Sequence, residues 1–168
     1  DGNWLEYKLF LKQNPQWPGL KRLRERAEIL IPKDENPKEV LNFFRKQKPQ
    51  TGIGALRLSS ALRRLENITD ANKVVIDAWI NLSLSVDEQF KYLDNYKSIL
   101  ISHHVKRMDN LLWRGDIYAA IEILSLLPSK NQTLVKARVG LQRGAPNVDK
   151  LIAAVPASHK KNSGLAYD

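Results

Sequence analysis

The sequence predicts an all-α fold, organised as a right-handed superhelical array of antiparallel helix pairs. Apolar residues recur at helical spacing in roughly ten segments of about 10 to 14 residues, and no window of useful length alternates with the period of two that marks a strand. Pro, Gly and Asn residues stand in the short links between these segments. The chain has 168 residues, 43% of them hydrophobic, so it can bury a core, and we expect one helical-repeat domain over residues 1–168.

A globular helix bundle would give the same helix content, so the array prediction rests on a repeated corner. Residues 65–78 and the stretch from Trp113 onwards both run from a helix end through a tight corner into an alanine-bearing helix. The alanines are Ala71 and Ala78 in the first stretch, and Ala119 and Ala120 in the second. This likeness favours an array over a bundle, although it is too loose for a strict tetratricopeptide period.

Start and stop residues divide the first 65 positions into four predicted helices. Pro15 and Pro32 end the first two helices. Asn36 followed by Pro37 is a strong start signal for the third, and Thr51 can cap the fourth. The predicted ranges are 3–14, 20–31, 36–49 and 51–65.

The second half of the chain carries similar signals. Ser85 with Glu88 forms a capping box, Gly115 stops a helix, and Ser129 with Gln132 can cap another. We expect Thr69-Asp70 to open the helix before the capping box. The predicted ranges are 69–82, 85–96, 102–115, a segment between 115 and 128, 129–144 and 147–155.

The chain is strongly basic, with 27 Lys and Arg against 18 Asp and Glu and a formal net charge of +9. An anionic partner is therefore plausible, such as nucleic acid, acidic lipid or a carboxylate-bearing polymer. The absence of cysteine excludes disulfides and thiolate metal sites. No apolar run approaches the roughly 18 residues of a membrane span.

Three constellations resemble reaction centres, and each has a simpler interpretation. His103 and His104 are adjacent, so on a helix they point about 100° apart and do not share a metal; we expect a solvated helix start. Glu25 and Glu28 lie one turn apart among arginines, which predicts surface ion pairs rather than a catalytic carboxylate pair. The Gly52–Gly54 stretch is too short for a phosphate loop and is predicted to be a helix-start turn.

Aromatic and basic side chains are the candidate binding residues. Trp79 and Trp113 stand in apolar helical runs and are predicted to pack between helices, whereas Trp17 in its proline-flanked turn is open to a ligand role. The basic residues form either solvated helix faces or contacts for a polyanion. The candidate contacts are Trp17, Lys21, Arg22, Arg24, Arg26, Arg57, Arg63 and Arg64.

Packing motifs spread along nearly the whole chain carry a family resemblance. They are Trp4-Leu5-Glu6-Tyr7, Phe10-Leu11, Asn14-Pro15, Trp17-Pro18, Leu23, Arg26-Ala27-Glu28, Phe44, Pro49-Gln50-Thr51-Gly52, Gly54-Ala55, Ala78-Trp79 and the stretch from Arg107 through Leu111-Leu112-Trp113 to Ala119. With these motifs the chain resembles the N-terminal superhelical domain of soluble lytic murein transglycosylases. The segment Asn162–Asp168 looks like the start of that domain's next helix.

The resemblance implies a scaffold rather than an enzyme. In that family a ring- or U-shaped helical array carries a separate lysozyme-like domain, whose catalytic Glu is usually followed by Ser. This sequence has no Glu-Ser dipeptide and no Gly-Leu-Met-Gln segment, so no catalytic residue is carried over. We therefore expect a truncated, non-catalytic part of a periplasmic transglycosylase with no cofactor or metal.

The expected partners follow from the same resemblance. They are peptidoglycan, bound weakly through charge, and the lysozyme-like domain in cis; nucleic acid and a membrane span are not expected. Two alternatives from other classes stay open, namely a protein-binding helical-repeat adaptor and an RNA-binding helical repeat.

Overall fold

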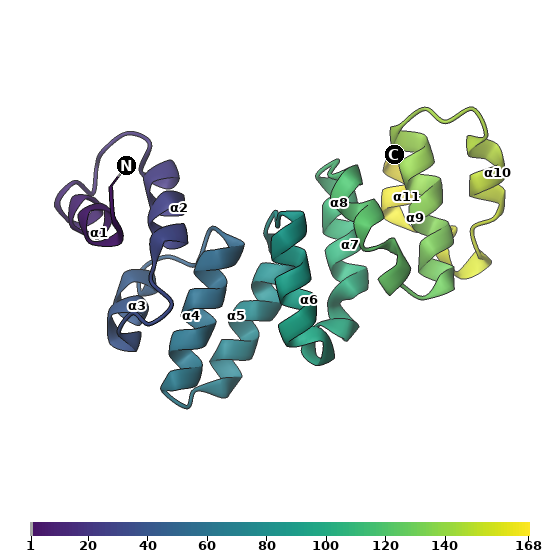
Figure 1. Cartoon of the computed structure of the whole chain (residues 1–168). Helices are drawn as coiled ribbons and strands as arrows, with labels where there is room; N and C mark the ends of the chain where they lie inside the picture. The colour runs from purple at the N-terminus through teal and green to yellow at the C-terminus, as the bar shows by residue number, and fades with distance from the viewer. Residues whose placement is uncertain (1) are drawn as a thin grey trace. The chain divides into compact units, whose positions relative to one another are not determined.

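The computed structural model describes residues 2–168, and this part of the chain is helical with no β-strand (Figure 1). The all-α prediction is therefore confirmed, and the number of helices is close to the ten expected. The chain forms two compact units, Asp1–Ile99 and Leu100–Asp168. The superhelical arrangement of the helix pairs stays a prediction.

The first unit is built from helices that pack against their neighbours in sequence. The pairs α1 and α2, α3 and α4, and α4 and α5 are in contact, and Figure 1 shows α4 and α5 side by side. The bounds are α1 (Trp4–Gln13), α2 (Leu20–Leu30), α3 (Pro37–Phe44), α4 (Gly52–Arg64), α5 (Ile68–Asn81) and α6 (Val86–Leu100).

Two aromatic clusters form much of the core of the first unit. Trp4 is buried and meets the edge of Phe43 at 4.7 Å between ring centroids, which joins α1 to α3. Trp79 is fully buried and stacks on Tyr92 at 6.2 Å, which joins α5 to α6. The predicted packing role of Trp79 is confirmed.

The second unit consists of shorter elements. They are η1 (Ile101–His103), α7 (His104–Trp113), α8 (Ile117–Glu122), η2 (Leu124–Leu126), α9 (Ser129–Gln142), α10 (Val148–Ala153), η3 (Ala157–His159) and α11 (Ser163–Tyr167). Here α7 contacts α8 and α9, and α9 contacts α10 and α11. Trp113 packs between helices as predicted, with its ring 4.9 Å from that of Tyr167, although 43% of its surface stays exposed.

The predicted repeated corner has the same backbone geometry at three places. Glu66, Gly115 and Gly144 each follow a helix in the left-handed conformation, with φ of 61°, 70° and 62°. The next backbone N–H then donates to the carbonyl five residues back, which is the Schellman arrangement. These bonds run from Asn67 to Leu62, from Asp116 to Leu111 and from Ala145 to Gly140.

Most of the local start signals act as predicted. Asn36 and Thr51 cap α3 and α4 by accepting backbone N–H donors with their side chains. Ser85 and Glu88 form the predicted capping box, since each side chain accepts the backbone N–H of the other residue. These signals succeed because both partners lie within four residues of one another.

One predicted helix start and one predicted cap are wrong, although α9 begins at Ser129 as predicted. Asn67 rather than Thr69 caps α5, because its side chain accepts the backbone N–H of Asp70 at 3.2 Å. Ser129 is the first residue of α9 and caps nothing. The side chain of Gln132 instead donates to a carbonyl oxygen in the preceding loop.

The predicted end of the third helix at Pro49 is also wrong, because α3 ends at Phe44. Arg24 from α2 donates to the carbonyl oxygens of Phe43 and Gln47, at 3.0 and 3.4 Å. A side chain from another helix thus satisfies carbonyl groups at the helix end.

Candidate functional site

A groove of about 540 Å³ in the first unit is the candidate site. It lies between α1, α2, the end of α3 and the loop after it. Its lining residues are Lys8, Leu11, Lys12, Pro15, Leu20, Lys21, Arg24, Asn42, Phe43, Arg45, Lys46, Gln47 and Gln50. Six of these thirteen are Lys or Arg and none is Asp or Glu, so the groove has a positive potential that attracts anions.

Arg24 is a fixed cation in the groove. Its guanidinium donates to the two α3-end carbonyls described above and lies 4.3 Å from the ring centroid of Phe43. Burial lowers the pKa of Arg24, and the charge of Glu28 opposes that shift. The guanidinium of Arg24 is therefore fixed in position by its contacts, whereas the ammonium group of a surface lysine would be mobile.

The rim cations divide into paired and unpaired groups. Lys8 forms a 2.9 Å ion pair with Glu39, and Lys21 lies 4.0 Å from Glu25. Lys12, Arg45 and Lys46 are exposed and have no ion pair within residues 2–168. These three charges are available to a ligand without breaking an existing contact.

Polar amides and apolar side chains complete the groove. Asn42, Gln47 and Gln50 offer amide donors and acceptors, and Leu11 and Leu20 offer apolar surface. Such a lining fits a ligand that carries carboxylates together with hydroxyl and amide groups. A simple inorganic anion would not use most of it.

Glu28 is the buried carboxylate of the first unit. It accepts the backbone N–H of Gln50 at 2.9 Å and both the N–H and the hydroxyl of Thr51, at 2.8 and 2.9 Å. Arg24 lies 3.7 Å from its other oxygen. Burial raises the pKa of Glu28 above its usual range, and the hydrogen bonds from Thr51 and Gln50 oppose that shift. Glu28 therefore ties α2 to the start of α4.

The predicted surface ion pairs are accordingly wrong for Glu28. Glu25 does lie on the surface side, 4.0 Å from Lys21. Glu28 is fully buried because Gly54, which has no side chain, lets α4 come directly against its carboxylate. The glycine stretch is thus a helix start, as predicted, and it also makes room for a buried ion.

The structure brings Lys21 and Arg24 together in the groove but leaves other predicted contacts outside it. Arg22 and Arg26 are exposed and do not line the groove. Trp17 is 54% exposed and meets the edge of Phe10 at 5.6 Å between ring centroids. Of the aromatic candidates, Trp17 therefore keeps an open face.

The side chains of the three arginines of α4 make contacts within the protein. Arg57 donates to the carbonyl oxygen of Ile31 at 2.8 Å, and burial lowers its pKa. Arg64 donates to a carbonyl oxygen at 2.7 Å. Arg63 bonds the side chain of Asn72 and lies 5.3 Å from the ring of Tyr96. None of the three lines the groove.

Sequence reasoning missed most of the groove cations. Lys8 and Lys12 come from α1, whereas Arg45 and Lys46 follow α3, so no local run of basic residues joins them to α2. The run Arg45–Lys48 at a helix end was the available signal, because three of its four residues are basic.

His104 in the second unit also departs from prediction. It was expected at a solvated helix start, but it is only 3% exposed. It shares one face of α7 with the buried residues Met108 and Leu111, at helical spacing. Burial lowers its pKa, and the charges of His103 and Arg107 add to that shift.

Arg138, like Arg107, is a buried arginine of the second unit. It is 1% exposed, donates to Asp109 at 2.6 Å and to Asp168, and lies 5.4 Å from the ring of Trp113. Arg138 and Asp109 also line a pocket of about 450 Å³. Arg138 and Asp109 are paired with one another, so Lys106 is the one Lys or Arg of this lining that is not in an ion pair within the described residues, against three in the first-unit groove.

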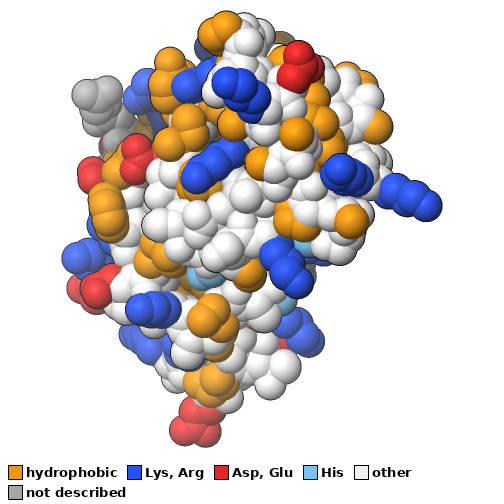
Figure 2. Space-filling view, turned by 90° about the vertical axis from the view of Figure 1, so that its right-hand side faces the viewer, with side chains coloured by type: hydrophobic (Ala, Val, Ile, Leu, Met, Phe, Trp, Pro, Cys, Tyr) orange, Lys and Arg blue, Asp and Glu red, His pale blue; other side chains and the backbone are white. Residues whose placement is uncertain are grey.

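Further observations bear on the site as a whole. Within residues 2–168 there is no group of three or more His, Cys, Asp or Glu side chains placed to hold a metal. Nor does that range contain a helix with the length and apolar character needed to cross a bilayer. On the face that Figure 2 shows, Lys and Arg side chains are scattered among fewer Asp and Glu. Comparisons with protein-family models, curated proteins and solved structures found no match to this chain.

Proposed function

We propose that the chain is a non-catalytic helical scaffold of a periplasmic lytic transglycosylase, and that the first-unit groove holds peptidoglycan. The observation that carries the proposal is the groove lining, with six cations and no carboxylate. The packing motifs that resemble the superhelical domain of these enzymes add support.

Peptidoglycan matches the chemistry of the groove. Its stem peptides carry carboxylates for Lys12, Arg45 and Lys46, and its sugars and peptide bonds offer hydroxyl and amide groups for Asn42 and Gln47. Exposed charge pairs contribute little each and are screened by salt, so binding is expected to be weak and salt-sensitive.

The carboxylate arrangement supports binding rather than bond cleavage. A glycan-cleaving site needs a carboxyl group within hydrogen-bond reach of the reacting oxygen. Glu28 is the carboxylate closest to Arg24, and its oxygen Oε2 is already occupied by donors from residues 50 and 51. The proposal therefore assigns cleavage to a lysozyme-like domain in cis.

Co-sedimentation with purified murein sacculi tests this function. The full chain is expected to pellet with sacculi at about 20 mM salt and to be released at about 300 mM, as screening shortens the range of its charges. A Lys12→Glu/Lys46→Glu variant is expected to lose most retention. The matched control is Lys130→Glu/Lys160→Glu, which makes the same charge change in the second unit and is expected to retain binding.

Two outcomes would overturn the proposal. Equal loss in both variants would mean that net charge, and not the groove, causes retention. Tighter binding of a fluorescent RNA oligonucleotide than of sacculi, with loss in the groove variant, would favour an RNA-binding repeat instead.

A further inference from the structure

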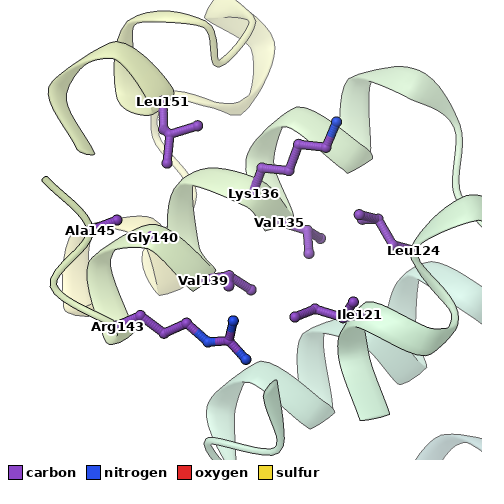
Figure 3. A pocket seen from close by; sticks show the side chains of 9 residues that line it. All are labelled: Ile121, Leu124, Val135, Lys136, Val139, Gly140, Arg143, Ala145 and Leu151. Atoms are coloured by element: carbon purple, nitrogen blue, oxygen red, sulfur yellow. The ribbon is translucent and has the colours of Figure 1, made fainter. Parts of the chain in front are cut away.

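An apolar pocket of about 330 Å³ lies in the second unit and shares no lining residue with the basic groove. Figure 3 shows the side chains of Val135, Val139, Ile121 and Leu124 converging on it from α8, η2 and α9. The full lining is Ile121, Leu124, Val135, Lys136, Val139, Gly140, Arg143, Ala145 and Leu151.

Packing between α9 and α10 shapes one wall of the pocket. A Cβ at Gly140 would lie 2.6 Å from Cδ1 of Leu151, so only glycine lets Leu151 approach α9 this closely. Opposite that wall, Ile121 is 41% exposed on α8. The pocket is therefore a preformed apolar hollow that opens to solvent.

Two cations border the apolar surface. Lys136 and Arg143 are exposed, and neither has an ion pair within the described residues. Figure 3 shows them on two sides of the hollow. The guanidinium of Arg143 also lies 5.3 Å from the ring of Tyr118, which is 81% exposed. An exposed tyrosine beside an apolar hollow is typical of protein interfaces.

We propose that this pocket docks an acidic amphipathic helix of a partner protein. Lys136 lies on α9 and Arg143 is the C-cap residue of that helix, seven residues later, which corresponds to about 10.5 Å along the helix axis. A partner helix with carboxylates seven positions apart meets both cations, and aliphatic residues at the third and fourth positions after the first carboxylate enter the hollow. Charge complementarity thus selects an acidic segment over a basic one.

A synthetic fluorescein-labelled peptide tests the docking site. The probe is a helical peptide with Glu at positions i and i+7 and Leu at i+3 and i+4, and anisotropy is measured on the full chain at low salt. Ile121→Glu is expected to weaken binding at least tenfold, because it places a charge in the hollow. Ile101→Glu is the matched control, since Ile101 is also an exposed isoleucine of this unit and does not line the pocket.

Charge reversal at the two cations distinguishes specific docking from non-specific binding. The Lys136→Glu/Arg143→Glu variant is expected to bind the acidic peptide at least tenfold more weakly. It is expected to bind instead a peptide with Lys at positions i and i+7. The same variant is expected to be retained on sacculi as well as the wild type. The docking site and the proposed murein binding can therefore be disproved independently of one another. Equal binding of both peptides by the wild type, no binding of the acidic peptide, or binding only to anionic phosphatidylglycerol vesicles would overturn the proposal.

Discussion

Both units bury charged side chains, and Glu28 of the first unit and Arg138 of the second are neutralised in different ways. In the first unit Glu28 accepts hydrogen bonds mainly from neutral groups at the start of α4. In the second unit Arg138 bonds two carboxylates, Asp109 and Asp168. Neutral donors leave the pKa of Glu28 raised by burial, whereas paired carboxylates balance the charge of Arg138 directly.

The two buried ions share one requirement, which is a glycine beside them. A Cβ at Gly54 would clash with the carboxylate of Glu28, and a Cβ at Gly164 would clash with the guanidinium of Arg138. Both glycines lie in the first turn of a helix, in α4 and α11. A helix start that comes close to a buried charge therefore needs a residue without a side chain.

The largest expected effect is that of Arg138→Ala. This change leaves the 3%-exposed side chain of Asp168 without its cation, and removal of one partner from a buried pair costs about 4 kcal/mol of unfolding free energy. Urea unfolding followed by amide NMR signals of the second unit measures it. Arg143→Ala, at the C-cap of the same helix, is the control and is expected to change the value by less than about 0.5 kcal/mol.

Gly54→Ala is expected to cost about 2 kcal/mol, because the new methyl group meets the side chain of Glu28 in a packed interior. The same urea titration, read on signals of the first unit, measures the loss. In a Glu28→Ala background the cost is expected to shrink. An unchanged cost there would show that Gly54 is not required by the buried carboxylate.

Glu28→Gln is expected to destabilise the first unit by about 2 kcal/mol at neutral pH. The amide oxygen can take the place of Oε2 and keep its three donors, but the amide NH2 group then takes the place of Oε1, where it faces the N–H of Gln50 and the guanidinium of Arg24. Glu25→Gln, one turn away on the surface side, is the control with little expected change. Equal effects of the two substitutions would remove the distinction between buried and surface carboxylates.

The pH dependence of the two units is expected to have opposite signs. The pKa of Glu28 is raised above 4.5, so the folded first unit binds the proton more tightly and its stability falls as pH rises through that raised pKa. The pKa of His104 is lowered below 6.5, so its contribution to the second unit is present above pH 6.5 and is lost as pH falls. Urea titrations at a series of pH values from 4 to 8 measure both trends. In the Glu28→Gln variant, the fall in the stability of the first unit with rising pH is expected to disappear.

Local signals account for what the sequence predicted well. The caps at Asn36 and Thr51, the Ser85–Glu88 box and the Gly115 stop all depend on partners within a few residues. The same reasoning failed at the end of α3, where carbonyl oxygens accept hydrogen bonds from Arg24, about twenty residues earlier.

The candidate site was predictable only in part for the same reason. Lys21 and Arg24 lie on one predicted helix face, and both line the groove. Lys12 and Lys46 join them only through packing of α1 and α3 against α2, and no pattern along the chain specifies that packing. Burial of Glu28 and Arg138 likewise depends on distant glycines.

The most direct test of the account is where peptidoglycan binds. A titration of the ¹⁵N-labelled chain with soluble anionic muropeptides, followed by amide chemical shifts, locates the contact residue by residue. The account predicts shifts at Lys12, Arg45, Lys46 and Gln47 that disappear with added salt, and unchanged signals in α9. Shifts concentrated in the second unit, or none in the first unit at concentrations where sacculi retain the protein, would contradict it.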